Sequence, residues 1–516
     1  MADITYRANL KAASFPFLSE LFGRSIIVKG PDQNAPIGKT EVGTTDSSNQ
    51  GVPQIYYCHN VVPTDNGYKS IGYDTVAAAI GTDSFVKVLT IRDSTGANAS
   101  LAIDDAGNLY VMEAGAGVWS TGLTGAPAAA TIAGKRMTAA FVSGTSYIYF
   151  SSIGCYSYDF STEQFTAETL SYDAPLTDAD VLGVVSNRGY LLVYTIDQLL
   201  WSSLVDPTDF VASLATGAGG GLLESARGSI VTVESLYGGL IVFTSANAVA
   251  GIASDNTRFP YNFTEVNGCG GLQDADFVSY DGNSNALHAY TTAGMQQVSV
   301  KGAVTTFPEV TDFLSGDALE DYDENTDTLT VTDTGDVILK KRIVVIASRY
   351  LIISYGLTSL THALYYDIAY KQWGRLRIDH VDCFELVPTA SEAPLDSIAF
   401  LQIDGTVKTV YSHILGHETL NGVMLIGKLQ YVRSRLLQLQ RVDFENVNVG
   451  ATFSLLDLPA ADGKNFGNAL TGYLAASSGK YREYLFHNTA LNHTLVFKGA
   501  FNAVSLTATF NVSGAR

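Results

Sequence analysis

Leu109-Tyr-Val-Met is a short apolar strand pattern that ends at a Gly-containing turn, and variants of it recur along the chain. The further copies are Tyr147-Ile-Tyr-Phe, Leu191-Leu-Val-Tyr, Leu240-Ile-Val-Phe, Leu287-His-Ala-Tyr, Leu329-Thr-Val-Thr, Leu351-Ile-Ile-Ser and Ala399-Phe-Leu-Gln. Successive copies begin 38, 44, 49, 47, 42, 22 and 48 residues apart. A repeat of about 40 to 50 residues with several strands per unit is typical of β-propeller blades, which bury their faces against neighbouring blades.

Two longer matches indicate internal duplication. Phe277–Leu287 aligns without gaps on Leu319–Leu329. Tyr158-Asp159-Phe160 aligns on Tyr366-Asp367-Ile368, and in both copies an aromatic residue follows six positions after the aspartate. We therefore expect an all-β fold with an irregular six- or seven-bladed β-propeller over residues 80–415. The single 22-residue step is expected to mark two hairpins of one blade.

The two ends of the chain differ from this repeat. Residues 1–79 are expected to form an N-terminal arm and linker, because 30–70 is rich in Gly, Pro, Asn and Thr. Residues 416–516 contain several long alternating segments separated by Gly-rich turns, which predicts a C-terminal β-sandwich-like domain. We expect the N-terminal arm to complete that sandwich.

The charge of the chain excludes some functions. Lys and Arg number 31 and Asp and Glu number 51, so the net charge is −20. A conventional nucleic-acid binder needs a basic surface, and so does a protein that adsorbs to an anionic membrane. Residues 1–40 carry +2 and residues 425–516 carry +4, so the part between them is strongly acidic.

The four cysteines are widely spaced and form no CxxC pair: Cys58, Cys155, Cys269 and Cys383. This pattern predicts buried thiols in a reducing compartment rather than disulfides or a metal centre. The N-terminal residues lack the apolar core of a secretory signal, and no apolar stretch reaches 18 residues. We expect a soluble protein that is not exported by the general secretory route.

Searches for catalytic and ligand-binding motifs nominate no site. Asp321–Asp327 resembles the start of a calcium loop but has Thr326 where that loop needs Gly, so a hairpin turn is the preferred interpretation. His380, Asp382 and Cys383 are interpreted as ordinary strand residues, and Gly217–Gly221 as a flexible loop. Carboxylates from distant blades can meet at a propeller centre, but the sequence nominates no pair. We expect no catalytic residues, no cofactor and no metal.

Three segments resemble a known family of phage proteins. Tyr57-Cys58-His59-Asn60-Val61-Val62-Pro63 resembles a Cys-x-Asn-x-x-Pro stretch near the start of packaged-DNA stabilisation proteins of short-tailed phages. Trp201-Ser-Ser-Leu-Val-Asp206-Pro207-Thr-Asp209-Phe210 is similar to their recurrent Ser, Asp-Pro-x-Asp-aromatic element. The segment from Asp367 to Trp373-Gly374 is similar to their Asp-to-Trp-Gly blade ending. Val61-Val62 departs from the Leu-Tyr pair that is more frequent in the family.

This resemblance implies a structural virion protein, the tail nozzle, also called tail tubular protein B. Six copies would form a tube below the portal and the adaptor ring, in a virion tail assembled in the bacterial cytoplasm. The tube would retain packaged double-stranded DNA and conduct it during ejection, and tail fibres or spikes could attach outside. An acidic lining suits this role, because it repels phosphate and lets the DNA slide without specific binding.

Two other functional classes remain open on sequence grounds. The first is a carbohydrate-binding or carbohydrate-active β-propeller, which would need aromatic platforms or converging carboxylates at the propeller mouth. The second is a cytoplasmic propeller scaffold for protein partners, although regular WD or kelch signatures are missing.

Overall fold

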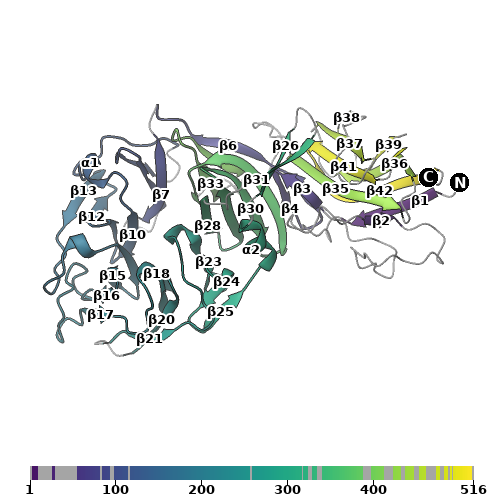
Figure 1. Ribbon diagram of the computed structural model, residues 1–516. Coiled ribbons are helices and arrows are strands. Elements are labelled where there is room, and N and C mark those ends of the chain that lie inside the picture. Colours follow the sequence, from purple (N-terminus) through teal and green to yellow (C-terminus); the bar gives the residue numbers. More distant parts are fainter. Residues whose placement is uncertain are drawn as a thin grey trace.

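The computed structural model shows a propeller joined to a second all-β domain (Figure 1). It describes residues 3–9, 26–28, 55–81, 84–92, 98–113, 117–255, 259–315, 318–323, 328–333, 340–386, 397–411, 422–431, 436–446, 452–460, 472–476, 481–485, 489–490 and 492–513. Within these ranges the only α-helices are two short ones, α1 (Ala129–Ile132) and α2 (Pro308–Leu314). None of the described helices has the length and apolar character needed to cross a membrane.

The first four blades follow one another along the chain. Blade 1 comprises β7 (Phe85–Arg92), β8 (Asn98–Asp104) and β9 (Leu109–Glu113). Blade 2 comprises β10 (Met137–Val142), β11 (Thr145–Phe150), β12 (Gly154–Asp159) and β13 (Gln164–Glu168). Blade 3 comprises β14 (Gly183–Asn187), β15 (Tyr190–Tyr194), β16 (Gln198–Trp201) and β17 (Gly219–Leu222). Blade 4 comprises β18 (Ile230–Leu236), β19 (Gly239–Thr244), β20 (Ala248–Ala253) and β21 (Tyr261–Glu265).

The remaining blades complete a ring of seven in the described part of the chain. Blade 5 comprises β22 (Val278–Asp281), β23 (Ala286–Thr291), β24 (Gly294–Ser299) and β25 (Gly302–Thr305). Blade 6 comprises β28 (Lys340–Ile346), β29 (Tyr350–Gly356), β30 (Leu360–Asp367) and β31 (Gln372–His380). Blade 7 comprises β32 (Asp382–Glu385), β33 (Ile398–Leu401), β34 (Val407–Tyr411) and β6 (Gly72–Ala77). The innermost strand of each blade contacts that of the next, and β32 contacts β7, so the ring is closed.

Blade 7 is closed by a strand from far upstream. Its outermost strand, β6, pairs antiparallel with β34, which lies more than 300 residues later in the sequence. The expected propeller boundary at residue 80 therefore leaves out one propeller strand. The sequence period could not include β6, because this strand stands alone and its blade partners lie at the other end of the repeat.

Two segments differ from the sequence-based interpretation. The 22-residue step does not mark two hairpins of one blade: β26 (Ala318–Asp323) and β27 (Thr328–Asp333) form a separate two-stranded sheet inserted before blade 6. Gly217–Gly221 is not a flexible loop, because its last three residues belong to β17 and pair with β16. Glycine suits this strand because a Cβ at Gly220 would lie 2.6 Å from the Leu199 carbonyl oxygen.

The second domain consists of two sheets built from both ends of the chain, as expected for the sandwich. One sheet contains β1 (Asp3–Asn9), β36 (Leu436–Asn446), β39 (Tyr481–Leu485), β40 (Thr489–Ala490) and β42 (Asn502–Ser513). The other contains β2 (Ile26–Val28), β3 (Ile55–His59), β35 (Gly422–Tyr431), β37 (Thr452–Ala460), β38 (Gly472–Ala476) and β41 (Asn492–Gly499). Three strands of the N-terminal arm thus pair with C-terminal strands.

One continuous sheet joins the two domains. Blade 6 extends from β31 through β4 (Val61–Pro63) and β5 (Tyr68–Ser70) into β42 of the sandwich. The segment 55–70 was expected to be a polar linker, but Ile55, Tyr57, Val61 and Tyr68 are fully buried. Its apolar residues lie within a polar composition, so the average over 30–70 concealed a core segment. The joint therefore combines backbone pairing with a shared apolar core.

Candidate functional site

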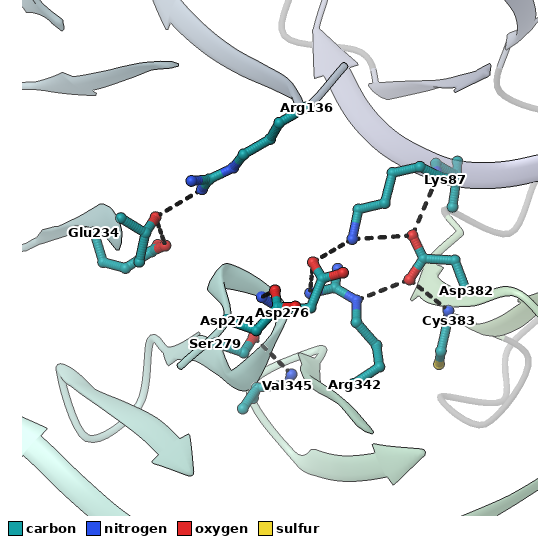
Figure 2. A network of polar contacts seen from close by, with 12 residues as sticks. Lys87, Arg136, Glu234, Asp274, Asp276, Ser279, Arg342, Val345, Asp382 and Cys383 are labelled. Carbon is teal, nitrogen blue, oxygen red and sulfur yellow. Dashed lines mark hydrogen bonds and ion pairs between the residues drawn. The ribbon is translucent and has the colours of Figure 1, made fainter. Parts of the chain in front are cut away.

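Six charged side chains gather where the innermost strands of the propeller surround its axis (Figure 2). We call them the axial cluster. They come from five innermost strands or the residues just before them, and from the 3-10 helix η4 (Ala275–Phe277) before β22. The members are Lys87, Arg136, Glu234, Asp276, Arg342 and Asp382. Three are cationic and three are acidic, so the charges can compensate one another.

Asp382 is the most buried member, with only 1% of its side chain exposed. Its Oδ1 accepts a hydrogen bond from Arg342 Nε at 2.8 Å and one from the Cys383 backbone N–H at 2.9 Å. Its Oδ2 accepts from the Val88 backbone N–H at 3.1 Å and lies 3.4 Å from Lys87 Nζ. Both carboxylate oxygens are therefore satisfied, as a buried charge requires. Through them, Asp382 ties blade 7 to blades 1 and 6.

Asp276 connects the same two cations to blade 5. Lys87 Nζ donates to Asp276 Oδ1, and Arg342 Nη1 lies 3.4 Å from that oxygen. Burial opposes ionisation of Asp276, but Lys87 and Arg342 hold its pKa well below the usual value. Burial also opposes the charged form of Arg342 and by itself would lower its pKa. The carboxylates of Asp382 and Asp276 outweigh this effect and raise the pKa of Arg342 above its ordinary value.

The pair between Lys87 and Asp276 joins two parts of the ring that are not neighbours. Lys87 belongs to blade 1 and Asp276 precedes blade 5, and blades 6 and 7 lie between them in the closed ring. Two blades of a seven-membered ring cannot be further apart than this. A direct ion pair between them therefore links parts of the ring that are not adjacent in it.

A second connection crosses from blade 2 to blade 4. Arg136 donates from Nη1 to the Val231 carbonyl oxygen and from Nη2 to Thr232 Oγ1, at 2.5 and 3.0 Å. The Thr232 hydroxyl donates in turn to Glu234 Oε1 at 3.1 Å. Burial raises the pKa of Glu234 to about 7, and this rise is opposed by the Thr232 hydrogen bond and the Arg136 charge. Glu234 is thus the axial carboxylate that titrates near neutrality.

We predict that Glu234 makes stability fall as the pH rises from about 4.5 to about 7. In this window the unfolded side chain ionises at its ordinary pKa of 4.5, whereas the folded one stays protonated up to about 7. Glu234→Gln should remove this component of the pH dependence, measured as the free energy of urea unfolding between pH 5 and 8. Asp276, whose pKa is lowered, has the opposite effect: it makes stability fall as the pH drops, and only below about pH 4. If the unfolding free energy of Glu234→Gln changed with pH as steeply as that of the parent chain, this assignment would be contradicted.

The axial cluster holds blades together through hydrogen bonds and ion pairs. Each described acid of the cluster hydrogen-bonds to a cation or, for Glu234, to the hydroxyl that a cation holds. Among the described residues there is no group of three His, Cys, Asp or Glu side chains placed to hold a metal. The arrangement joins blades 1, 5, 6 and 7 and separately blades 2 and 4.

The first family-like motif lies at the joint between the domains. Cys58 is in β3, Pro63 ends β4, and Asn60 lies between them with a left-handed φ of 52°. Asn60 Oδ1 accepts hydrogen bonds from the Tyr73 hydroxyl at 3.1 Å and from the Arg377 backbone N–H at 3.0 Å. Burial raises the pKa of the Cys58 thiol to about 12, against the opposing charge of Arg375, so this cysteine stays a buried thiol.

The second motif shapes the long loop between β16 and β17. Trp201 ends β16, and its Nε1 donates to the Gly217 carbonyl oxygen at 3.0 Å. Asp206 Oδ1 accepts from the backbone N–H and the hydroxyl of Thr208, at 2.9 and 2.7 Å. Pro207 follows within this turn, and Asp209 accepts from the Val211 backbone N–H at 3.1 Å. These are turn-stabilising contacts of the kind that Asp side chains make.

The third motif closes the outer hairpin of blade 6. Asp367 is buried and pairs with Arg349, whose Nη2 lies 3.0 Å from Oδ2. Its Oδ1 accepts from the Ala369 and Tyr370 backbone N–H groups at 2.9 and 3.1 Å. Trp373 packs against Tyr366, with ring centroids 4.6 Å apart. The first and third motifs are neighbours, because β4 pairs with β31 and Gly374 lies against Val61 and Pro63, whereas the second motif lies in blade 3.

The residues considered as metal ligands have structural partners. His380 is buried, and its ring nitrogens lie 2.8 Å from Ser354 Oγ and from the Ile378 carbonyl oxygen. Burial lowers the pKa of His380 to about 4 and raises that of the Cys383 thiol. Asp281, which aligns with Asp323, accepts hydrogen bonds from the Asn283 backbone N–H and the Ser284 hydroxyl, and so stabilises the hairpin turn between β22 and β23. The corresponding turn at 324–327 lies outside the described residues.

Sequence reasoning missed the axial cluster. The available signal is weak: each member is a charged residue within an innermost strand or at most two residues before it, as Lys87 is in β7 and Arg342 in β28. Aligning the blades on their first strands does not bring these charges to a shared position, because Lys87 is the third residue of β7, Glu234 the fifth of β18 and Asp382 the first of β32. The sequence also does not say which of these charges pair with one another, because that depends on where each blade lies in the closed ring.

Comparison with known proteins adds the following findings. No family model and no curated protein matches the chain. Among solved structures, the extracellular domain of a hybrid two-component system, BT3049 of B. thetaiotaomicron, matches with TM-score 0.38 and 12% identity, over 64% of this chain and 40% of that one. YCF48 from Cyanidioschyzon merolae matches with TM-score 0.38 and 12% identity, over 66% and 99%. The extracellular domain of BT4673, also from B. thetaiotaomicron, matches with TM-score 0.41 and 10% identity, over 89% and 62%. These proteins indicate no function for this chain, and none of them is a phage tail protein.

Proposed function

We propose that this chain is a structural subunit of a short-tailed phage tail nozzle. In this role six copies form a ring below the portal and adaptor, retain packaged double-stranded DNA and conduct it during ejection. The proposal rests on the resemblance of the three sequence motifs and treats the chain as a non-enzymatic virion component. Fibres or spikes would attach to the outer surface.

The observation that best supports the proposal is the continuous sheet between the propeller and the sandwich. The subunits of a tube wall must hold their domains in a fixed relation, and backbone pairing from β31 through β4 and β5 to β42 does this. The motif containing Cys58, Asn60 and Pro63 lies at that joint. The phage-like segment thus occupies the position that sets the geometry of the subunit.

The axial cluster supports the proposal in a second way. The charged side chains of the axial cluster occupy space around the propeller axis, which argues against a duct for duplex DNA within a single chain. In a nozzle, the duct would therefore lie between chains arranged in a ring. The net charge of −20 suits such a duct, because acidic walls do not arrest a polyanion.

Negative-stain electron microscopy of the purified full-length chain tests this proposal. We expect six-fold rings that contain six chains of 55.1 kDa and an axial hole between the subunits. A chain that stays monomeric at micromolar concentration and binds sugars on a glycan array would contradict the proposal and favour the carbohydrate-binding alternative.

A further inference from the structure

The loop between β16 and β17, residues 202–218, displays aliphatic side chains to solvent. Val205 is 90% exposed and Leu214 is 73% exposed. Leu204 and Val211 are 48% and 38% exposed. Scattered single apolar residues are normal on protein surfaces, but four within eleven residues form a local concentration.

Hydrogen bonds and one buried anchor hold this loop in shape. Asp206 and Asp209 fix two successive turns, and Asp173 Oδ2 accepts from the Ala212 backbone N–H at 2.9 Å. Phe210 is fully buried and packs on Tyr172, with ring centroids 5.7 Å apart. The aliphatic side chains are therefore presented by an ordered backbone. Such preorganisation lowers the entropic cost of binding.

The charge around the loop indicates what it binds. Residues 161–225 contain nine acidic residues and one basic residue, Arg188. Asp206, Asp209 and the exposed Glu224 lie in or beside the loop. Although the whole chain carries −20, residues 425–516 carry +4. The acidic segment 161–225 and the basic C-terminal region are thus complementary in charge.

We propose that the 202–218 loop is a docking surface for the basic C-terminal region of a second copy of this chain. The aliphatic side chains would form the apolar centre of the contact, and the surrounding carboxylates would meet Lys and Arg at its rim. Because the two surfaces differ, the contact is head-to-tail and can close into a ring. The inference concerns self-association and does not depend on a phage origin.

Charge substitutions in the apolar centre test the surface. The double variant Val205→Asp, Leu214→Asp should weaken self-association by roughly thirtyfold or more, measured by sedimentation velocity. Val118→Asp is the control, because Val118 is 64% exposed but lies after β9, far from the 202–218 loop in the sequence. Both variants should keep the parent melting temperature. A parent chain that is monomeric throughout, or a double variant that associates like the parent, would overturn the inference.

Carbodiimide coupling of a mixture of isotopically light and heavy chains identifies the partner region. The reagent activates a carboxylate, and a lysine amine then forms an amide with loss of the activating group. We expect mixed-isotope links from Asp206, Asp209 or Glu224 to the lysines of the C-terminal region, Lys428, Lys464, Lys480 and Lys498. Intermolecular links confined to other segments would overturn this assignment while leaving the proposed nozzle function untouched.

Discussion

Replacing Asp382 by Asn is expected to destabilise the propeller by about 3–5 kcal/mol, the largest effect of any single polar substitution considered. The variant removes the negative charge that Arg342 Nε contacts at 2.8 Å and leaves this cation with the more exposed Asp276. The Asn side chain also offers one acceptor oxygen where the carboxylate offers two. Removing one partner of a buried pair costs more than the pair itself contributes, because the remaining charge stays desolvated.

Tryptophan fluorescence during urea unfolding measures this effect. The three tryptophans, Trp119, Trp201 and Trp373, all lie within the propeller part of the chain, so the signal reports on that domain. Asp379→Asn is the control, because Asp379 is exposed and its substitution should change stability by less than about 0.5 kcal/mol. If Asp382→Asn lowered the free energy of unfolding by less than 1 kcal/mol, the axial cluster would not be holding the blades together. Adding Arg342→Met should recover part of the loss, since it removes the uncompensated charge.

Replacing Tyr73 by Ala is expected to cost about 3–5 kcal/mol, because it empties a buried aromatic position at the closure of the ring. Tyr73 lies in β6 and is 2% exposed, and its ring meets Phe400 edge-on with centroids 6.1 Å apart. Its hydroxyl donates to Asn60 Oδ1, so the residue connects blade 7 to the interdomain joint. Loss of the ring weakens the only strand that covers the outer edge of β34 among the described residues.

Tyr73→Phe separates packing from hydrogen bonding. It keeps the ring and should cost only about 1 kcal/mol, because Asn60 Oδ1 still accepts from the Arg377 backbone N–H. Hydrogen exchange provides the second measurement: amides of β34 should exchange faster in Tyr73→Ala than in Tyr73→Phe. Unchanged protection of β34 in the Ala variant would mean that β6 does not secure the closure.

Much of the fold could be predicted from the sequence because its main signal is local. Each blade is a run of hairpins, so its strands and turns recur at a spacing that one can read along the chain. The apolar copy at Leu191, for example, is the fully buried β15. The alternating segments after residue 420 likewise indicated further strands, and their composition separated them from the acidic repeat.

The candidate site could not be predicted in the same way. Lys87 and Asp276 meet although 189 residues separate them, and each on its own resembles an ordinary surface charge. Only the closed ring brings them to one axis, and only there does burial give their charges an energetic consequence. Asn60 and Arg377, separated by 317 residues, meet for the same reason at the interdomain joint.

The sequence by itself determined the strand content, the blade period, the acidic character of the body and the strand-rich, basic C-terminal region. These properties depend on composition and on neighbours within about fifty residues. Tertiary structure alone decided that seven blades close through β6, that β26 and β27 form a separate hairpin, and that a shared sheet joins the domains. It also decided which charges meet at the axis, because pairing across a ring depends on closure in space and not on spacing along the chain.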